Sequence, residues 1–227
     1  VIDAAPLVAT LLSACPALKV LATSRIRLRI SGECERPVQP LRATTGDEAV
    51  TQWTGTSRTA AGRGSGGFAP AVQLFIERAQ AVRPDLVSSP ADVATVAAIC
   101  QRLDGLPLAI ELAAARVNAI QLPDLLDRLE RRLPVLTGGP RDAPARLRTM
   151  RDAIGWSYDL LEEDERRLFR SLAVFAGGFT LAAAEGVSAR DLPVFDLLAS
   201  LVEKSLLKIQ WTASGETRYG FLETIRE

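Results

Sequence analysis

The most constraining stretch of this chain is a pair of helical segments joined by a very short turn, within residues 100–112 (CQRLDGLPLAIEL). Gly105 suits the left-handed position just past a helix C-terminus. Pro107 suits the first turn of the next helix, where a missing N–H costs nothing. Helices joined this tightly pack at a fixed angle, and their junction brings backbone groups and a rigid proline ring to one point. A bare Gly-x-Pro is also typical of a purely structural corner, and that interpretation stays open here.

Length and composition favour a globular protein without a membrane anchor. The 227 residues are 48% hydrophobic and 24% charged, enough for one large or two small domains. The formal net charge is zero, so no overall field attracts nucleic acid or an acidic membrane surface. Neither a signal segment nor an apolar run of about 18 residues is found, which predicts a cytoplasmic location.

The residue inventory argues against catalysis by this chain. It has no histidine, which excludes a Ser/His/Asp triad, a histidine base and histidine metal ligands. Cys15, Cys34 and Cys100 lack the short spacings of a disulfide framework or a metal site. No G-x-x-x-x-G-K-[ST] loop is present, and no strand ends in magnesium-binding carboxylates. We therefore predict no metal and no enzyme activity, and we set aside a free-standing hydrolase.

Residues 1–41 predict a small α/β portion. A helix to about Ala14 is followed by the continuous apolar run of residues 19–23, typical of a strand buried on both faces. Residues 34–41 contain two prolines and suit an edge strand. Thr23, Ser24 and Arg25 would lie at the carboxyl end of the first strand, where open α/β sheets bind ligands. Arg25 could meet an anion there, but a surface arginine in a loop fits the position equally well.

The rest of the chain predicts helices, a turn-rich boundary and a hairpin. Residues 42–69 are rich in Gly, Ser and Thr and read as a flexible linker. Residues 70–133 carry helical periodicity and form a small helical domain, with a capping box at Ser89. Residues 134–146 are a second linker. Residues 147–227 combine helices with a C-terminal hairpin, and the family resemblance given next implies that they form a winged-helix domain.

Several of these segments resemble one known family. The GLPLA string at residues 105–109 resembles the motif of the NB-ARC group of STAND nucleotide switches. Its flanks, with WSYDLL at 156–161 and LAVFAGGF at 172–179, are most similar to bacterial regulators of the AfsR and LuxR-like type. Thr23-Ser24-Arg25 resembles the sensor motif of the same family. The resemblance covers most of the chain except residues 42–69.

The resemblance implies a fold and a set of site residues. The fold would be mainly α with a small α/β remnant at the N-terminus, then a helical bundle and a winged-helix domain with a β-hairpin wing. The sensor residues would read the terminal phosphate of ATP. The nucleotide would also be contacted at the helix corner, through four residues: Gly105, Leu106, Pro107 and Leu108.

The resemblance also implies a function. The chain would be the regulatory, non-catalytic part of an ATP/ADP-dependent switch in a transcriptional regulator. Both ends lie in predicted helices, so we expect a longer parent. The parent would supply the phosphate loop from a preceding nucleotide-binding core, could oligomerise on activation, and would contact DNA through a separate domain. ATP or ADP would be the cofactor of that parent, and this chain alone would bind neither tightly.

The alternative is a winged helix that itself binds DNA. The helix within residues 191–204 is the recognition helix by position. Its expected exposed residues are three acids, one serine and one base: Asp191, Asp196, Glu203, Ser200 and Lys204. DNA-reading helices need Arg, Lys, Asn or Gln toward bases and phosphates. This composition favours a winged helix that packs against other domains.

Overall fold

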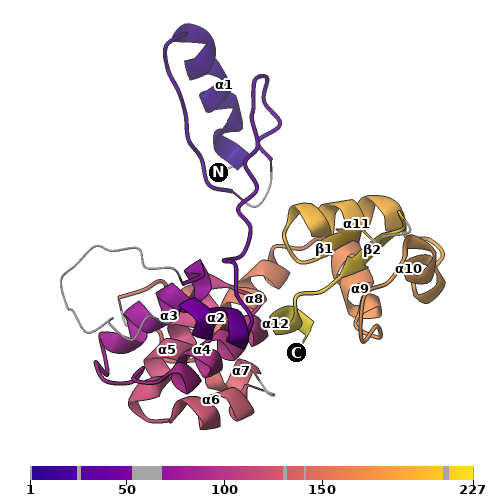
Figure 1. The fold of residues 1–227 in the computed structure, drawn as a ribbon. Coiled ribbons are helices and arrows are strands. Elements are labelled where there is room, and N and C mark those ends of the chain that lie inside the picture. The colour runs from indigo at the N-terminus through magenta and orange to yellow at the C-terminus, as the bar shows by residue number, and fades with distance from the viewer. Residues whose placement is uncertain are drawn as a thin grey trace. The chain divides into compact units, whose positions relative to one another are not determined.

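The computed structural model describes residues 2–24, 27–52, 68–129, 132–140, 142–211 and 215–226. These residues are mostly helical, with a small two-stranded antiparallel sheet and a C-terminal winged-helix arrangement (Figure 1). The chain divides into two compact units. The first comprises Val1–Val38 and Leu161–Phe221, and the second comprises Gln39–Leu160 and Leu222–Glu227.

The second unit is a bundle of short helices. They are α2 (Gly46–Gln52), α3 (Pro70–Gln80), α4 (Pro90–Arg102), α5 (Pro107–Ala115), α6 (Leu122–Arg128), α7 (Arg132–Val135), α8 (Met150–Asp159) and α12 (Glu223–Arg226), with 3-10 turns at Arg116–Asn118 and Ala145–Leu147. Helix α3 packs on α5 and α4, and α4 also packs on α6. The predicted start of α4 is confirmed. Ser89 Oγ accepts the Asp92 N–H at 3.2 Å, and Asp92 Oδ2 accepts the Ser89 N–H at 2.9 Å.

The core of the bundle is apolar and tightly closed. Phe75, Ile99, Leu103 and Ile110 are all fully buried. Cys100 is buried among them, and its thiol lies 3.3 Å from the carbonyl oxygen of Ala71. Burial raises the pKa of Cys100 to about 12, because a thiolate would lose its hydration there. The residue is a core thiol.

The prediction that residues 42–69 form a flexible linker is wrong for Gly46–Gln52, which form helix α2. This helix packs against α4, and its Ala49 is fully buried in the core. Thr45 and Glu48 cap its start reciprocally, with Glu48 Oε2 accepting the Thr45 N–H at 3.2 Å. This capping box is a local physical reason why a helix begins here. Residues 53–67 of the predicted linker lie outside the described residues.

The part of the first unit from Leu161 to Phe221, here called the winged-helix unit, contains three helices and a hairpin among its described residues. They are α9 (Glu163–Leu172), α10 (Leu181–Val187), α11 (Val194–Glu203), β1 (Lys208–Trp211) and β2 (Thr217–Gly220). The strands pair antiparallel with Lys208 opposite Gly220 and Gln210 opposite Arg218. Phe179 joins the second strand through a bridge to Tyr219. The predicted hairpin is thus confirmed, although its tip at residues 212–214 lies outside the described residues.

The N-terminal residues form a helix and extended chain. Helix α1 spans Ala5–Ala14 after a 3-10 turn at Ile2–Ala4. The predicted strands over 19–23 and 34–41 are wrong. Among the described N-terminal residues neither segment pairs as a strand, and Leu21 is 97% exposed. A strand exists only when a neighbouring strand accepts and donates its backbone hydrogen bonds.

Candidate functional site

Helix α11 is the recognition helix by its position in the sequence. A buried network of charged and polar side chains holds it against α9. Lys204 Nζ contacts both carboxylate oxygens of Glu165. The Ser200 hydroxyl donates to the same carboxylate. The side chains of Lys204 and Glu165 are only 14% and 5% exposed. The prediction that Lys204 belongs to the outer face of this helix is therefore wrong, because its ammonium is held inside the domain.

The environment of Glu165 keeps its carboxylate charged. Burial on its own raises the pKa of this group, but hydrogen bonds from Lys204, Ser200 and the Glu162 N–H together outweigh that effect. The net result is a pKa below the ordinary value of 4.5. The ion pair therefore persists at neutral pH and fixes α11 against α9.

The outward face of α11 is apolar and acidic. Its exposed residues are Phe195, Asp196 and Ala199, and Phe195 is 61% exposed. Asp191 just before the helix is exposed as expected, but Ser200 and Glu203 are only partly so. With Lys204 engaged inside, α11 offers no cation on that face for phosphate groups.

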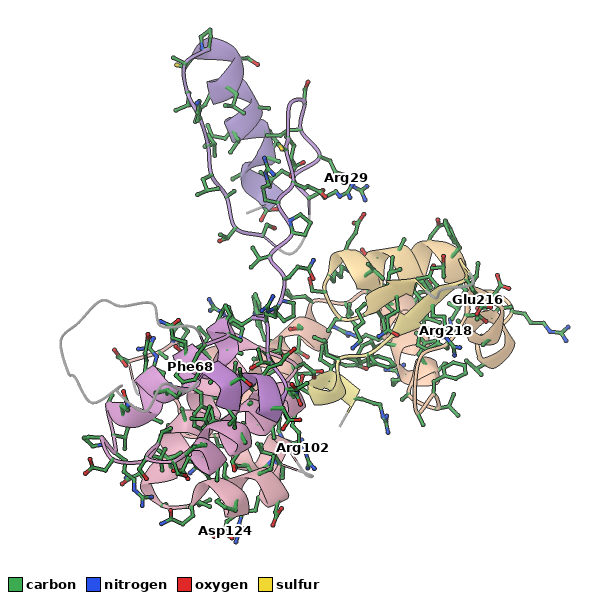
Figure 2. All side chains as sticks on the ribbon, viewed as in Figure 1. Arg29, Phe68, Arg102, Asp124, Glu216 and Arg218 are labelled. Carbon is green, nitrogen blue, oxygen red and sulfur yellow. The ribbon has the colours of Figure 1, made fainter. Side chains whose placement is uncertain are left out.

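The two-stranded ribbon has a different composition. Lys208, Gln210 and Arg218 share one face of the ribbon, because Gln210 pairs with Arg218 and Lys208 lies two residues before Gln210. Gln210 is exposed, and Lys208 is partly exposed. Arg218 Nη2 donates to the carbonyl of Gly178 at 2.6 Å, which fixes its guanidinium beside the strand (Figure 2). This face carries residue types that can contact a nucleic acid.

A surface depression on the same unit is a poor anion site. It has a volume of about 430 Å³ and is lined by Arg167, Arg170, Ser171, Ala189 and Leu192. Carboxylates already pair with both arginines, Asp164 and Asp191 with the first and Glu163 with the second. The hydrogen bond to Asp164 raises the pKa of Arg167. The acids cancel the attraction that the two arginines would offer.

The α4–α5 corner has the predicted local geometry. Gly105 adopts φ +66°, and a Cβ added there would collide with the carbonyl oxygen of Leu41. Its own carbonyl accepts the Leu41 N–H at 2.9 Å. Pro107 begins α5 and is exposed, whereas Leu106 and Leu108 are partly buried. The corner is therefore rigid, closely packed by a distant segment, and presents its proline to solvent.

The candidate sensor residues belong to the other unit. Thr23 and Ser24 are exposed and lie in extended chain outside any strand, and Arg25 lies outside the described residues. A nucleotide site shared by these residues and the corner stays a prediction. Within the described part of the chain, no group of acidic, cysteine or histidine side chains is arranged to hold a metal ion. In that same part, no helix is long and apolar enough to cross a membrane.

Sequence reasoning missed two polar contacts that only the fold creates. One is the Glu165–Lys204 pair, whose members are 39 residues apart. The other joins Asp104 at the corner to Thr224, 120 residues away, with the Thr224 N–H donating to Asp104 Oδ2 at 3.2 Å. The sequence offered one clue to Glu165, since it stands three residues after Glu162 at a helix start.

Comparison with known proteins identifies the C-terminal portion. Residues 161–227 match the family model of the winged helix-turn-helix domain. This agrees with the three helices and the hairpin described above. The matched residues begin at Leu161, which is also the residue where the chain enters the first compact unit for the second time.

Two curated proteins of Mycobacterium tuberculosis are similar over nearly the whole chain. The one named "Putative HTH-type transcriptional regulator Rv0890c" is 42% identical over 226 residues, which cover 98% of this chain and 23% of that protein. "Uncharacterized protein Rv0894" is 33% identical over 228 residues, covering 98% of this chain and 52% of that protein. The chain thus spans about a quarter and about half of these two relatives.

Proposed function

We propose that this chain is a segment of a helix-turn-helix transcriptional regulator and that its winged-helix domain contacts DNA. The observation that carries the proposal is the match of residues 161–227 to the winged helix-turn-helix model. The printed name of one relative, similar over 98% of this chain, supports it. These comparisons support the DNA-binding alternative better than the nucleotide-switch interpretation, because neither mentions a nucleotide.

The charge distribution favours the ribbon over α11 as the contact. A two-stranded β-ribbon fits the major groove as well as an α-helix does. The ribbon carries Lys208, Gln210 and Arg218 on one face, whereas α11 exposes Phe195 and Asp196. The electrostatic part of DNA affinity comes from Lys and Arg side chains that neutralise phosphates. DNA binding by this chain is therefore weak and led by the ribbon, with a dissociation constant on the order of 10⁻⁴ to 10⁻⁶ M.

Fluorescence anisotropy with a labelled duplex at several salt concentrations tests this proposal. Lys208→Ala is expected to weaken binding and to reduce the slope of log affinity against log salt by about one. Asp196→Ala on α11 is expected to preserve or strengthen binding. Lys19→Ala is the matched control, because Lys19 is an exposed lysine outside the winged helix.

Two outcomes of that experiment would contradict the proposal. Absence of any salt-dependent binding would reject DNA contact and favour a winged helix that packs against another protein domain through α11. An equal effect of the Lys208 and Lys19 substitutions would reject the ribbon as the contact.

A second candidate is the nucleotide-switch role implied by the sequence resemblance. In it the parent protein supplies the phosphate loop, ATP or ADP is the cofactor, and this chain contributes the α4–α5 corner and the sensor segment without catalysing a reaction. The apolar exposure of the N-terminal residues supports a missing partner segment. Leu21 and Val38 are 97% and 96% exposed, which suits a surface that another element covers.

Isothermal titration of the full-length parent with ADP and with ATP separates this candidate from the first. This chain alone is expected to bind neither nucleotide tightly, because it lacks a phosphate loop. A sub-micromolar affinity would contradict that expectation. In the full-length parent, Arg25→Ala should spare ADP and weaken ATP binding by about tenfold or more, the value of one charge-assisted contact. Pro107→Ala should weaken both nucleotides alike. Equal loss of ADP and ATP in Arg25→Ala would reject the sensor role.

A further inference from the structure

Residues 222–226 follow the winged-helix fold in sequence but belong to the bundle. Phe221 still belongs to the winged-helix unit, where its ring meets that of Phe169 edge-on at 5.3 Å. From Leu222 onward the chain belongs to the second unit. Residues 222–226 are therefore matched by the winged-helix model in sequence, but they belong to the helical bundle in space.

Helix α12 contacts the α4–α5 corner through Thr224. Its backbone bonds include those from Ile225 and Arg226 to the carbonyl of Leu222. Thr224 is fully buried, and its N–H and hydroxyl lie 3.2 and 3.5 Å from Asp104 Oδ2.

The carboxylate that makes this contact is held in place by an uncommon backbone conformation. Asp104 adopts φ +54°, a left-handed conformation that aspartate tolerates at a small energetic cost. Its N–H donates to Gln101 at 3.0 Å, and the Gly105 N–H donates to Cys100 at 3.1 Å. These bonds close the α4 terminus and fix the direction of the Asp104 side chain. The corner thus presents a charged acceptor to one distant backbone donor.

We propose that Asp104 is a latch that holds the C-terminal segment, residues 222–226, on the α4–α5 corner. When the latch is closed, residues 222–226 are fixed on the bundle. When it opens, α12 loses this anchor and unfolds. The device does not depend on what the winged helix binds, so it stands apart from the function proposed above.

Hydrogen exchange measured by mass spectrometry on the whole chain tests the latch. Asp104→Gly removes the carboxylate but suits the left-handed backbone, so the corner should keep its fold. Exchange of the peptide covering residues 222–226 is expected to become about tenfold faster, as loss of one charge-assisted hydrogen bond predicts. Exchange in α9 and α11 should not change.

The matched control is Ser205→Gly, which makes the same kind of change at φ +59° in the winged-helix unit. It should leave exchange at residues 222–226 unaltered. Thr224→Val keeps the backbone donor and removes the hydroxyl, so a smaller acceleration than in Asp104→Gly supports the latch. Unchanged exchange at 222–226 in Asp104→Gly would overturn it. A uniform rise throughout the bundle would also overturn it, because Asp104 would then serve general stability only.

Discussion

Lys204, the cation of the recognition helix by position, faces inward and pairs with Glu165 of α9. The pair joins two helices through charges that water reaches poorly, and Ser200 completes the acceptor's hydrogen bonding. Because the pair is buried, its parts cannot be removed singly without leaving an unpaired charge. The network therefore serves the architecture of the domain, and it keeps the ammonium of Lys204, the residue that follows α11, away from the surface.

Replacing Lys204 by methionine should destabilise the winged-helix unit strongly. The substitution leaves Glu165 buried without its partner, which costs about 3–5 kcal/mol in comparable buried pairs. Urea unfolding followed by circular dichroism measures the change in free energy. Lys19→Met, at an exposed lysine, is the control and should change stability by no more than about 0.5 kcal/mol. Similar effects of the two substitutions would show that the pair contributes nothing.

Glu165 should make stability depend on acid pH. Its folded pKa lies below its ordinary value of 4.5, so the ionised group favours the folded state. This stabilisation is fully present above the ordinary pKa and is lost as pH falls through the lower folded pKa. Unfolding free energies from neutral pH to about pH 3 should fall less steeply for Glu165→Gln than for the wild type. Parallel pH curves would contradict the assignment.

Thiol labelling should separate the three cysteines. Cys15 and Cys34 are exposed and Cys100 is buried, with its pKa raised to about 12 by burial. A disulfide reagent at mildly alkaline pH should therefore titrate two thiols of the native protein quickly and the third only after unfolding. Cys100→Ala should abolish the slow phase. Fast reaction of all three thiols in the native protein would mean that the bundle core is open at Cys100.

Gly105 and Gly155 form a matched pair for testing the α4–α5 corner. At Gly105 the positive φ and the approach of the Leu41 carbonyl both oppose a side chain, so Gly105→Ala should destabilise the chain by about 2 kcal/mol or more. At Gly155, inside α8, a Cβ meets no atom within 4 Å. Gly155→Ala should instead stabilise by about 0.5–1 kcal/mol. Thermal unfolding of both variants measures this contrast, and equal shifts would reject it.

Local chemistry alone determined several of the helix starts. Ser89 with Asp92, Thr149 with Asp152, and Thr180 with Ala183 all make the cap contacts that short sequence patterns predict. Such contacts span three residues, so the sequence contains both partners. The same holds for Thr45 and Glu48 at the start of α2, where the pattern was present but the Gly- and Ser-rich residues that follow concealed it.

Only the tertiary structure decided which distant groups meet. The pairing of Lys204 with Glu165 and of Asp104 with Thr224 depends on how whole helices pack, and no periodicity or spacing encodes it. The apolar run at residues 19–23 shows that a local pattern can also predict an element that does not form. Its composition suits a buried strand, but strand formation needs a partner's backbone, and in the described residues none pairs with it. Composition sets what a segment can become, whereas its neighbours in space decide whether its hydrogen bonds and charges are satisfied.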